Sequence, residues 1–139
     1  MAFEFFTKRT IEFADTDMAG IVHFSRFFVF METAETEFLE SIDVLRAFLQ
    51  KGSALLMPRV SAECDFQHPA KFGDVLDVHT MIKRKGRTSL TYRHIFQKDG
   101  RIIAKGEVTS VCCRKDGSGK IHSAPIPESI SSKIEEAPL

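Results

Sequence analysis

The spacing of apolar residues along the chain changes twice, from strand alternation to a helical repeat and back to strand alternation. Residues 3–13 alternate loosely between apolar and polar side chains, which predicts a strand that ends at the polar loop 14–20. After Gly20 no proline or glycine interrupts the chain until beyond Ile42. Over this stretch apolar side chains recur at helical steps, as in Phe24, Phe27, Phe28, Met31, Ala34 and Phe38. The spacing predicts one long helix, and Val29 and Phe30 widen its apolar arc so that its first half is expected to be buried nearly all round.

Acidic side chains distinguish the second half of this predicted helix. Its glutamates are expected to reach solvent or a partner: Glu32, Glu35, Glu37 and Glu40. A short helix over Val44–Leu49 is expected to follow and to end at Lys51–Gly52.

From about residue 59 onward the pattern has a period of two. Apolar and polar residues alternate over 59–66, 75–83, 89–97 and 101–113, and turn residues separate these runs. The dipeptide Asp99–Gly100 is a strong signal for a hairpin between the last two of these runs. A final helical turn is expected from about Pro127, because proline is well tolerated at the first position of a helix. One strand, a long apolar helix and four antiparallel strands predict an α+β domain over 1–139. Its economical arrangement is a five-stranded antiparallel sheet wrapped around the helix.

Composition narrows the class of protein without naming a function. The chain has 139 residues, of which 43% are hydrophobic and 27% charged, as expected of one folded domain. Nineteen Lys and Arg balance nineteen Asp and Glu, which argues against a nucleic-acid binder that relies on overall positive charge. Of the 13 Phe, nine fall within the first 38 residues, so the N-terminal part needs bulky apolar side chains.

The cysteines and the N-terminus indicate a cytoplasmic protein. Cys64, Cys112 and Cys113 form an odd, sparse set without a Cys-x-x-Cys spacing, so neither a disulfide framework nor a zinc site is expected. Charged residues such as Glu4 and Lys8 interrupt any signal-peptide core, and no apolar run approaches the roughly 18 residues of a membrane span.

The loop before the long helix holds the best candidate chemistry. Asp15 and Asp17 lie two residues apart, and Gly20 lets the backbone turn just before the helix. A helix N-terminus offers free N–H groups that can stabilise an oxyanion, and a carboxylate beside it can attack a carbonyl carbon or deprotonate a water. The same two residues could equally be ordinary turn and capping residues, so spacing alone leaves both interpretations open.

Two other features are less specific. His23 lies at the helix start, while the remaining histidines are scattered and show no metal-ligand spacing. Lysines and arginines gather with Ser and Thr hydroxyls over residues 83–89, with no acidic residue between Asp77 and Asp99. Such a basic turn suits phosphate oxygens, although a solvated hairpin tip explains it as well.

The stretch Phe13–Phe24, followed by Arg26–Phe28 and the Glu-Thr-Ala-Glu-Thr-Glu end of the helix, resembles a known family. It is similar to the 4-hydroxybenzoyl-CoA thioesterase family of hotdog-fold acyl-CoA thioesterases, including the bacterial members associated with the Tol-Pal system. Supporting matches are 66–74, Arg87-Thr-Ser and 125–130, and the likeness extends over about residues 3–130.

The resemblance implies an α+β hotdog fold and hydrolysis of an acyl-CoA to a carboxylic acid and free CoA. It places the catalytic Asp at Asp17, gives Asp15 a structural role, and makes the backbone N–H of Phe24 the donor to the thioester oxygen. The residues that would bind substrate are Gly20, His23 and Phe27, with Lys85, Arg87 and Ser89 at the CoA phosphates. No cofactor or metal is implied, since CoA is part of the substrate. Family members are homodimers or homotetramers with the pocket between subunits.

Three questions stay open at this stage. Asp17 could act as a nucleophile through a mixed anhydride or as a general base for water. A hotdog module that binds acyl-CoA without hydrolysing it is an alternative, as is a hotdog hydratase or dehydratase. The last is disfavoured because such enzymes usually place Asn-Pro between their Asp and His, and neither residue lies between Asp17 and His23. The identity of the acyl group does not follow from the sequence.

Overall fold

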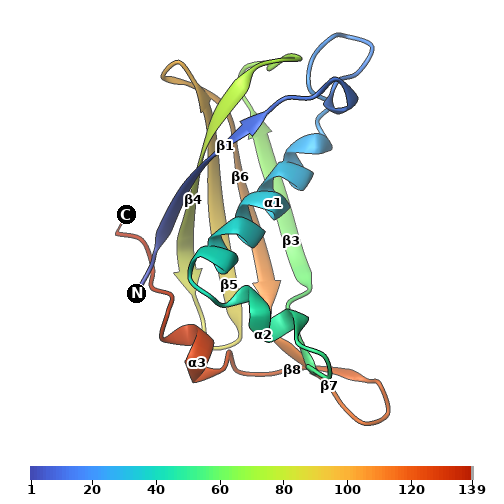
Figure 1. Cartoon of the computed structure of the whole chain (residues 1–139), viewed down its shortest axis with the longest axis vertical. Coiled ribbons are helices and arrows are strands. Elements are labelled where there is room, and N and C mark those ends of the chain that lie inside the picture. The colour runs from blue at the N-terminus through green and yellow to red at the C-terminus, as the bar shows by residue number, and fades with distance from the viewer. Residues whose placement is uncertain (139) are drawn as a thin grey trace.

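A five-stranded antiparallel sheet that curves around one long helix forms the body of the molecule, in a computed structural model that describes residues 1–138. The strand order is β1-β4-β5-β6-β3, and helix α1, Arg26–Ser41, lies across the inner face (Figure 1). The strands are β1 Glu4–Thr10, β3 Arg59–Phe66, β4 Val75–Lys85, β5 Ser89–Lys98 and β6 Arg101–Val111. The predicted α+β class, the five strands and the long helix are confirmed.

Shorter elements complete the chain. They are the 3-10 helix η1 Phe13–Asp15, helices α2 Leu45–Leu49 and α3 Glu128–Ser131, and a second sheet of β2 Leu55–Leu56, β7 Cys113–Lys115 and β8 Ile121–Ser123. The second sheet is absent from the sequence prediction, because two or three residues are too few to establish a period of two. The first strand ends before residue 13, where η1 begins. The long helix begins later than predicted, because 21–25 still belong to the loop.

The hairpin predicted at Asp99–Gly100 is confirmed in detail. Both residues have positive φ, 51° for Asp99 and 76° for Gly100, as a type I′ turn requires. This turn connects β5 to β6, whose register pairs Lys98 with Arg101.

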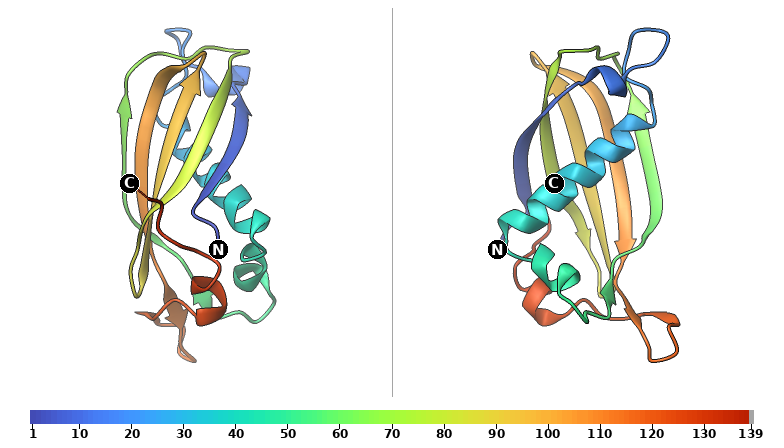
Figure 2. Two further views of the ribbon diagram at one scale, coloured as in Figure 1. Left: turned by 90° about the vertical axis from the view of Figure 1, so that its left-hand side faces the viewer. Right: turned by 45° about the vertical axis from the view of Figure 1, so that its right-hand side comes forward.

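Only one side of α1 is covered by the sheet, as both views in Figure 2 show. Phe27, Phe30 and Met31 are buried against the strands, whereas Val29 is 40% exposed on the opposite side. The expectation that the first half of the helix is buried all round is therefore wrong for this chain by itself. The apolar arc is wider than the surface that one sheet covers.

Glu35 was predicted to reach solvent or a partner, and within this chain it does not reach solvent. Its side chain is buried beneath α1 and pairs with the guanidinium of Arg59, at the start of β3. Burial raises the pKa of this carboxyl above its ordinary value, and Arg59 opposes the rise. A helical pattern alone does not reveal such a pair, because the cation is 24 residues away in the sequence.

Gly106 on β6 allows α1 to approach the sheet closely. A Cβ at this position would lie 2.3 Å from the sulfur of Met31 and 3.0 Å from the carbonyl oxygen of Glu63. We therefore expect Gly106→Ala to push α1 away from β6 and to lower the free energy of unfolding by about 1–3 kcal/mol. Urea unfolding measures this loss, and an unchanged stability would contradict the close approach. Gly117→Ala is the control, since nothing lies within 4 Å of a Cβ there.

Candidate active site

The segment between β1 and α1 folds into a small hairpin. Thr16 bridges to Val22, and its neighbours extend the pairing: Asp17 N–H donates to the Ile21 carbonyl at 2.9 Å and His23 N–H to the Asp15 carbonyl at 2.8 Å. Gly20, with φ of +80°, provides the left-handed residue at the tip. This hairpin places the two aspartates directly before the N-terminus of α1.

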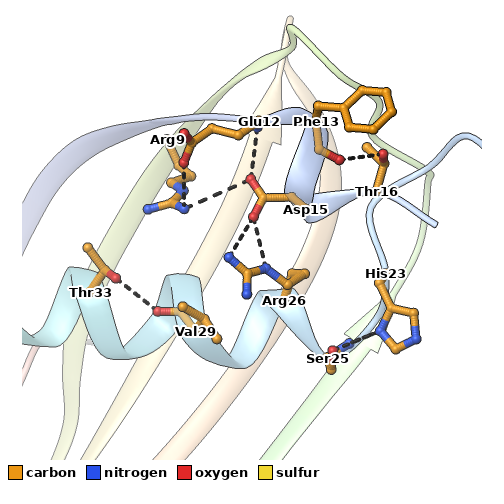
Figure 3. A network of polar contacts seen from close by, with 10 residues as sticks. All are labelled: Arg9, Glu12, Phe13, Asp15, Thr16, His23, Ser25, Arg26, Val29 and Thr33. Atoms are coloured by element: carbon orange, nitrogen blue, oxygen red, sulfur yellow. Dashed lines mark hydrogen bonds and ion pairs between the residues drawn. The ribbon is translucent and has the colours of Figure 1, made fainter.

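Asp15 holds the hairpin onto the helix. Its side chain is fully buried, and Oδ1 accepts a hydrogen bond from Nε of Arg26 at 2.8 Å and forms an ion pair with Nη2 at 2.8 Å (Figure 3). Oδ2 accepts a hydrogen bond from the N–H of Glu12 at 2.8 Å, and Arg9 lies 3.9 Å away. A buried carboxylate with this many partners serves the structure of the loop.

Asp17 is bound more loosely. Its Oδ1 accepts a hydrogen bond from the N–H of Ala19 at 2.8 Å, which closes a local turn, and its side chain is half-buried. No group in the described part of the chain donates a hydrogen bond to Oδ2. This oxygen is therefore available to attack a carbon atom or to take a proton.

Phe24, a loop residue two positions before the start of α1, has a backbone N–H without a partner in the described part of the chain. The N–H groups of Arg26, Phe27 and Phe28 donate to carbonyls three residues earlier, whereas the N–H of Phe24 has no hydrogen-bond partner within residues 1–138. The first turn of this 16-residue helix contains no acidic side chain of its own. The positive end of the helix dipole therefore supports this free donor, an arrangement suited to a developing oxyanion.

The other loop residues named by the family resemblance have distinct surroundings. The Nδ1 atom of His23 lies 2.7 Å from the hydroxyl of Ser25, and its ring stacks on the 61% exposed Phe24. Phe27 is 4% exposed and packs against Phe66 and Phe96, so the core accounts for its side chain without a ligand.

The basic turn predicted at residues 83–89 lies at the opposite end of the sheet from Asp17. Strand β4 runs from the hairpin end to this turn over 11 residues, a span of about 33 Å. The ammonium of Lys85 is bound by the carbonyls of Ser131 and Ile134 at 3.1 and 2.8 Å. Arg87, by contrast, is exposed, and no described acidic group pairs with it. A single chain therefore does not bring the two predicted parts of the site together.

Residues 1–138 form neither a cluster of metal ligands nor a helix that could span a membrane. They contain no group of three or more His, Cys, Asp or Glu side chains placed to hold a metal ion. Among their helices, none combines the length and the apolar character needed to cross a membrane.

A five-stranded antiparallel sheet that curves around one long helix is the hotdog fold, which is the fold of known thioesterases. A family model of the thioesterase-like superfamily matches residues 11–134. The 1,4-dihydroxy-2-naphthoyl-CoA hydrolase of Thermosynechococcus vestitus is 31% identical over 134 residues, which cover 94% of this chain and 88% of the relative.

Solved structures agree with the sequence comparison. A 1,4-dihydroxy-2-naphthoyl-CoA thioesterase from Synechocystis superposes with a TM-score of 0.84 at 25% identity, covering 94% of both chains. A gentisyl-coenzyme A thioesterase gives a TM-score of 0.81 at 29% identity, with 92% of this chain and 98% of the other covered. The chain belongs to the thioesterase-like superfamily, and it is an acyl-CoA thioesterase.

One buried polar residue in the middle of the sheet is missed by sequence reasoning. His94 occupies an inward position of β5, between Tyr92 and Phe96, where the alternation calls for an apolar residue. Its Nδ1 lies 2.8 Å from the hydroxyl of Thr80 on β4, and its Nε2 has no partner. A histidine at an inward position of an apolar alternation was the available signal.

The burial of His94 predicts an acid-sensitive stability. Desolvation lowers the pKa of its imidazole from 6.5 to about 4, so the ring is neutral when folded and takes a proton more readily when unfolded. The contribution of the neutral ring to the free energy of unfolding is therefore complete above pH 6.5 and is lost as the pH falls toward 4. We expect about 2 kcal/mol less stability at pH 5.0 than at pH 6.5. Urea unfolding at the two pH values tests this, and His94→Gln should abolish most of the difference. If the unfolding free energy of His94→Gln fell as much between pH 6.5 and pH 5.0 as that of the wild type, His94 would not be the source of the effect.

Proposed function

We propose that residues 1–139 act as one hotdog domain in which Asp17 and the Phe24 N–H carry out the hydrolysis of an acyl-CoA thioester. The observation that supports this most is the unpartnered Phe24 N–H at the N-terminus of α1, with a free carboxylate oxygen on the adjoining hairpin. The thioester carbonyl oxygen would accept the hydrogen bond from Phe24 N–H. The donor becomes more valuable as negative charge builds on that oxygen in the tetrahedral intermediate.

Asp17 then acts in one of two ways. As a nucleophile, its Oδ2 attacks the carbonyl carbon and expels CoA thiolate, and water hydrolyses the resulting mixed anhydride. As a general base, it takes a proton from a water that attacks the same carbon. In both routes the products are a carboxylic acid and CoA, and the thiolate leaves without a strong general acid. Gly20 and His23 would border the reacting group.

A homodimer joined through strand β3 is the proposed assembly. This strand is at an edge of the sheet, and nearly all of its residues are exposed, including Val60 at 62% and Phe66 at 48%. The loop residue Phe24, 61% exposed, continues this apolar surface, since its ring packs edge-on against that of Phe66. Edge strands with exposed apolar side chains are usually covered by another element. In the proposed dimer, β3 of one chain pairs in antiparallel fashion with β3 of the partner. Pairing of two such dimers would give the tetramer that some family members form.

This pairing would also unite the two parts of the site. The basic turn lies at the end of the sheet where β3 begins, and Asp17 lies at the end where β3 stops. In an antiparallel β3 pair, the five-stranded sheet of the partner runs in the opposite direction. The basic turn of one chain would therefore face the hairpin of its partner. Arg87 and Ser89 are the proposed contacts to the CoA phosphates, whereas Lys85 is occupied by α3.

The proposed reaction needs no metal or cofactor, because the carboxylate and the helix N-terminus provide its two chemical functions. The cytoplasm is the proposed compartment, because the three cysteines have free thiols, as is usual in a reducing environment.

Release of free thiol from a panel of short-chain, long-chain and aromatic acyl-CoAs tests the proposal. Hydrolysis of at least one class by the wild-type chain, and its loss in Asp17→Asn, is the expected outcome. Tight binding of an acyl-CoA without thiol release would contradict the proposal.

A further inference from the structure

A contact between two charged side chains joins the hairpin that carries Asp17 to the helix that follows Phe24. Arg26 is the first residue of α1, and its Nε and Nη2 atoms both lie 2.8 Å from Oδ1 of Asp15 (Figure 3). Asp15 precedes Asp17 by two residues, and Arg26 follows Phe24 by two. The contact therefore closes a short loop that contains both groups of the proposed reaction. We refer to it as the Asp15–Arg26 clamp.

The tip of the hairpin has little else to hold it against α1. Met18 at the tip is fully exposed, and the carboxylate of Asp17 is bound by the N–H of Ala19 on the same hairpin. The hydrogen bond from Val22 N–H to the Ala70 carbonyl, at 2.8 Å, ties the hairpin to the loop before β4 rather than to α1. Asp17 is thus placed through its backbone, and the clamp is the side-chain link between that backbone and α1.

The position of Arg26 is unfavourable for the helix by itself. The N-terminus of a helix carries a partial positive charge, so a cation in the first turn is destabilising and an acidic residue is preferred. The first turn of α1 contains no acidic residue, and Asp15, whose side chain is fully buried, compensates the charge of Arg26 from the hairpin. An arginine at this position is therefore explained by the group it binds and not by the stability of the helix.

The clamp fixes the orientation of the Asp15 carboxylate as well as its distance from α1. A guanidinium is planar and rigid, so two of its nitrogens on one oxygen define a direction that a single contact does not. The other oxygen, Oδ2, accepts a hydrogen bond from Glu12 N–H at 2.8 Å. With both oxygens held, the backbone that leads to Asp17 is held too. Such precision matters, because a displacement of about 1 Å between reacting groups can lower a rate about 10²-fold.

We propose that Arg26 is a positioning residue for thioester hydrolysis. Through Asp15, it keeps the carboxylate of Asp17 in the place relative to Phe24 N–H that the reaction requires. This inference rests on the proposed function, because it assumes that Asp17 and Phe24 N–H act on one thioester. Arg26 is assigned no contact with the substrate, so its effect belongs in kcat and not in KM.

The kinetics and the stability of two Arg26 variants test this role, with thiol release measured well below the melting temperature of each. Arg9 lies 3.9 Å from Asp15 and leaves the buried carboxylate a cation nearby, so Arg26→Ala is expected to fold. This variant should lower kcat about 10²-fold and change KM little. Arg26→Lys keeps the charge but offers a single point of contact. It should recover most of the melting temperature and little of kcat, whereas a merely structural role would recover both together.

Chemical rescue provides a second readout. The side chain of Arg26 is 35% exposed, so its removal opens a place beside Asp15 that a guanidinium ion can enter from solvent. Guanidinium chloride, far below the concentrations that unfold the protein, should raise kcat of Arg26→Ala severalfold. Sodium chloride at the same ionic strength should not, and neither salt should raise kcat of Asp17→Asn.

Thr7→Val is the matched control for a lost contact with α1. The hydroxyl of Thr7 on β1 donates to Oε2 of Glu37 on α1 at 2.8 Å, in the half of the helix that lies away from Phe24. Its removal should lower the melting temperature and leave kcat at the wild-type value.

Wild-type kcat in Arg26→Ala, or in Arg26→Lys if Arg26→Ala does not fold, would overturn the inference, and so would equal effects of the two salts. Equal turnover by the wild type and Asp17→Asn would overturn the proposed function instead, whatever the Arg26 variants do.

Discussion

Asp17→Asn is expected to lower kcat for thiol release by roughly 10³-fold or more while leaving the fold unchanged. The amide cannot attack the carbonyl carbon, and it does not take a proton from water near neutral pH. Its side-chain oxygen can still accept the hydrogen bond from Ala19 N–H, so the hairpin turn is kept. Steady-state thiol release and a thermal melt of both proteins measure the two expectations.

Asp15→Asn is the matched control, two residues away on the same hairpin. Asp15 is fully buried and bound to the guanidinium of Arg26, so removing its charge should cost about 3 kcal/mol of unfolding free energy. Asp15→Asn is therefore expected to lower the melting temperature, whereas Asp17→Asn is expected to leave it unchanged. Turnover near the wild-type rate in Asp17→Asn would contradict the assignment of the reaction centre.

Arg87→Ala is expected to raise KM for acyl-CoA about tenfold with little change in kcat. After the loss of turnover in Asp17→Asn, this is the second largest effect expected on catalysis. Arginine binds phosphate through charge-assisted hydrogen bonds, and such contacts far from the reacting atoms contribute equally to substrate and transition state. The contrast between acyl-CoA and a thioester of the short pantetheine arm, which lacks the nucleotide, isolates this contact. For the truncated substrate the variant and the wild type should have the same KM.

Lys85→Ala controls for the loss of positive charge at the same turn. The ammonium of Lys85 is held by the carbonyls of Ser131 and Ile134, so its removal should loosen α3 and lower the melting temperature. KM should change far less than in Arg87→Ala. A tenfold rise in both variants, or in neither, would contradict the proposal that Arg87 meets the phosphates.

Local patterns predicted the elements of this fold because each of them depends on neighbours in the sequence. The helical spacing of Phe27, Met31 and Ala34 predicted α1, and the pair Asp99–Gly100 predicted the β5–β6 hairpin with its two positive φ values. The loop that holds Asp15 and Asp17 was likewise predicted from its turn residues, whereas its pairing as a hairpin was not.

Features that depend on distant partners could not be predicted in this way. Glu35 belongs to an acidic run on a helix, and only the fold brings it to Arg59. The separation between Asp17 and the basic turn follows from the direction of β4, which a strand pattern does not state. The exposed side of α1 follows from how far the sheet extends around it, a property of the whole molecule (Figure 2).

Subunit mixing tests most directly the central claim that Asp17 of one chain and Arg87 of its partner complete one site. Asp17→Asn and Arg87→Ala chains, unfolded and refolded together in equal amounts, form a heterodimer in half of the molecules. If the site is shared, each heterodimer has one intact site. At an acyl-CoA concentration well below KM, total activity should then rise by about a quarter of the wild-type value above the average of the two separate variants. No gain over that average would contradict the shared site.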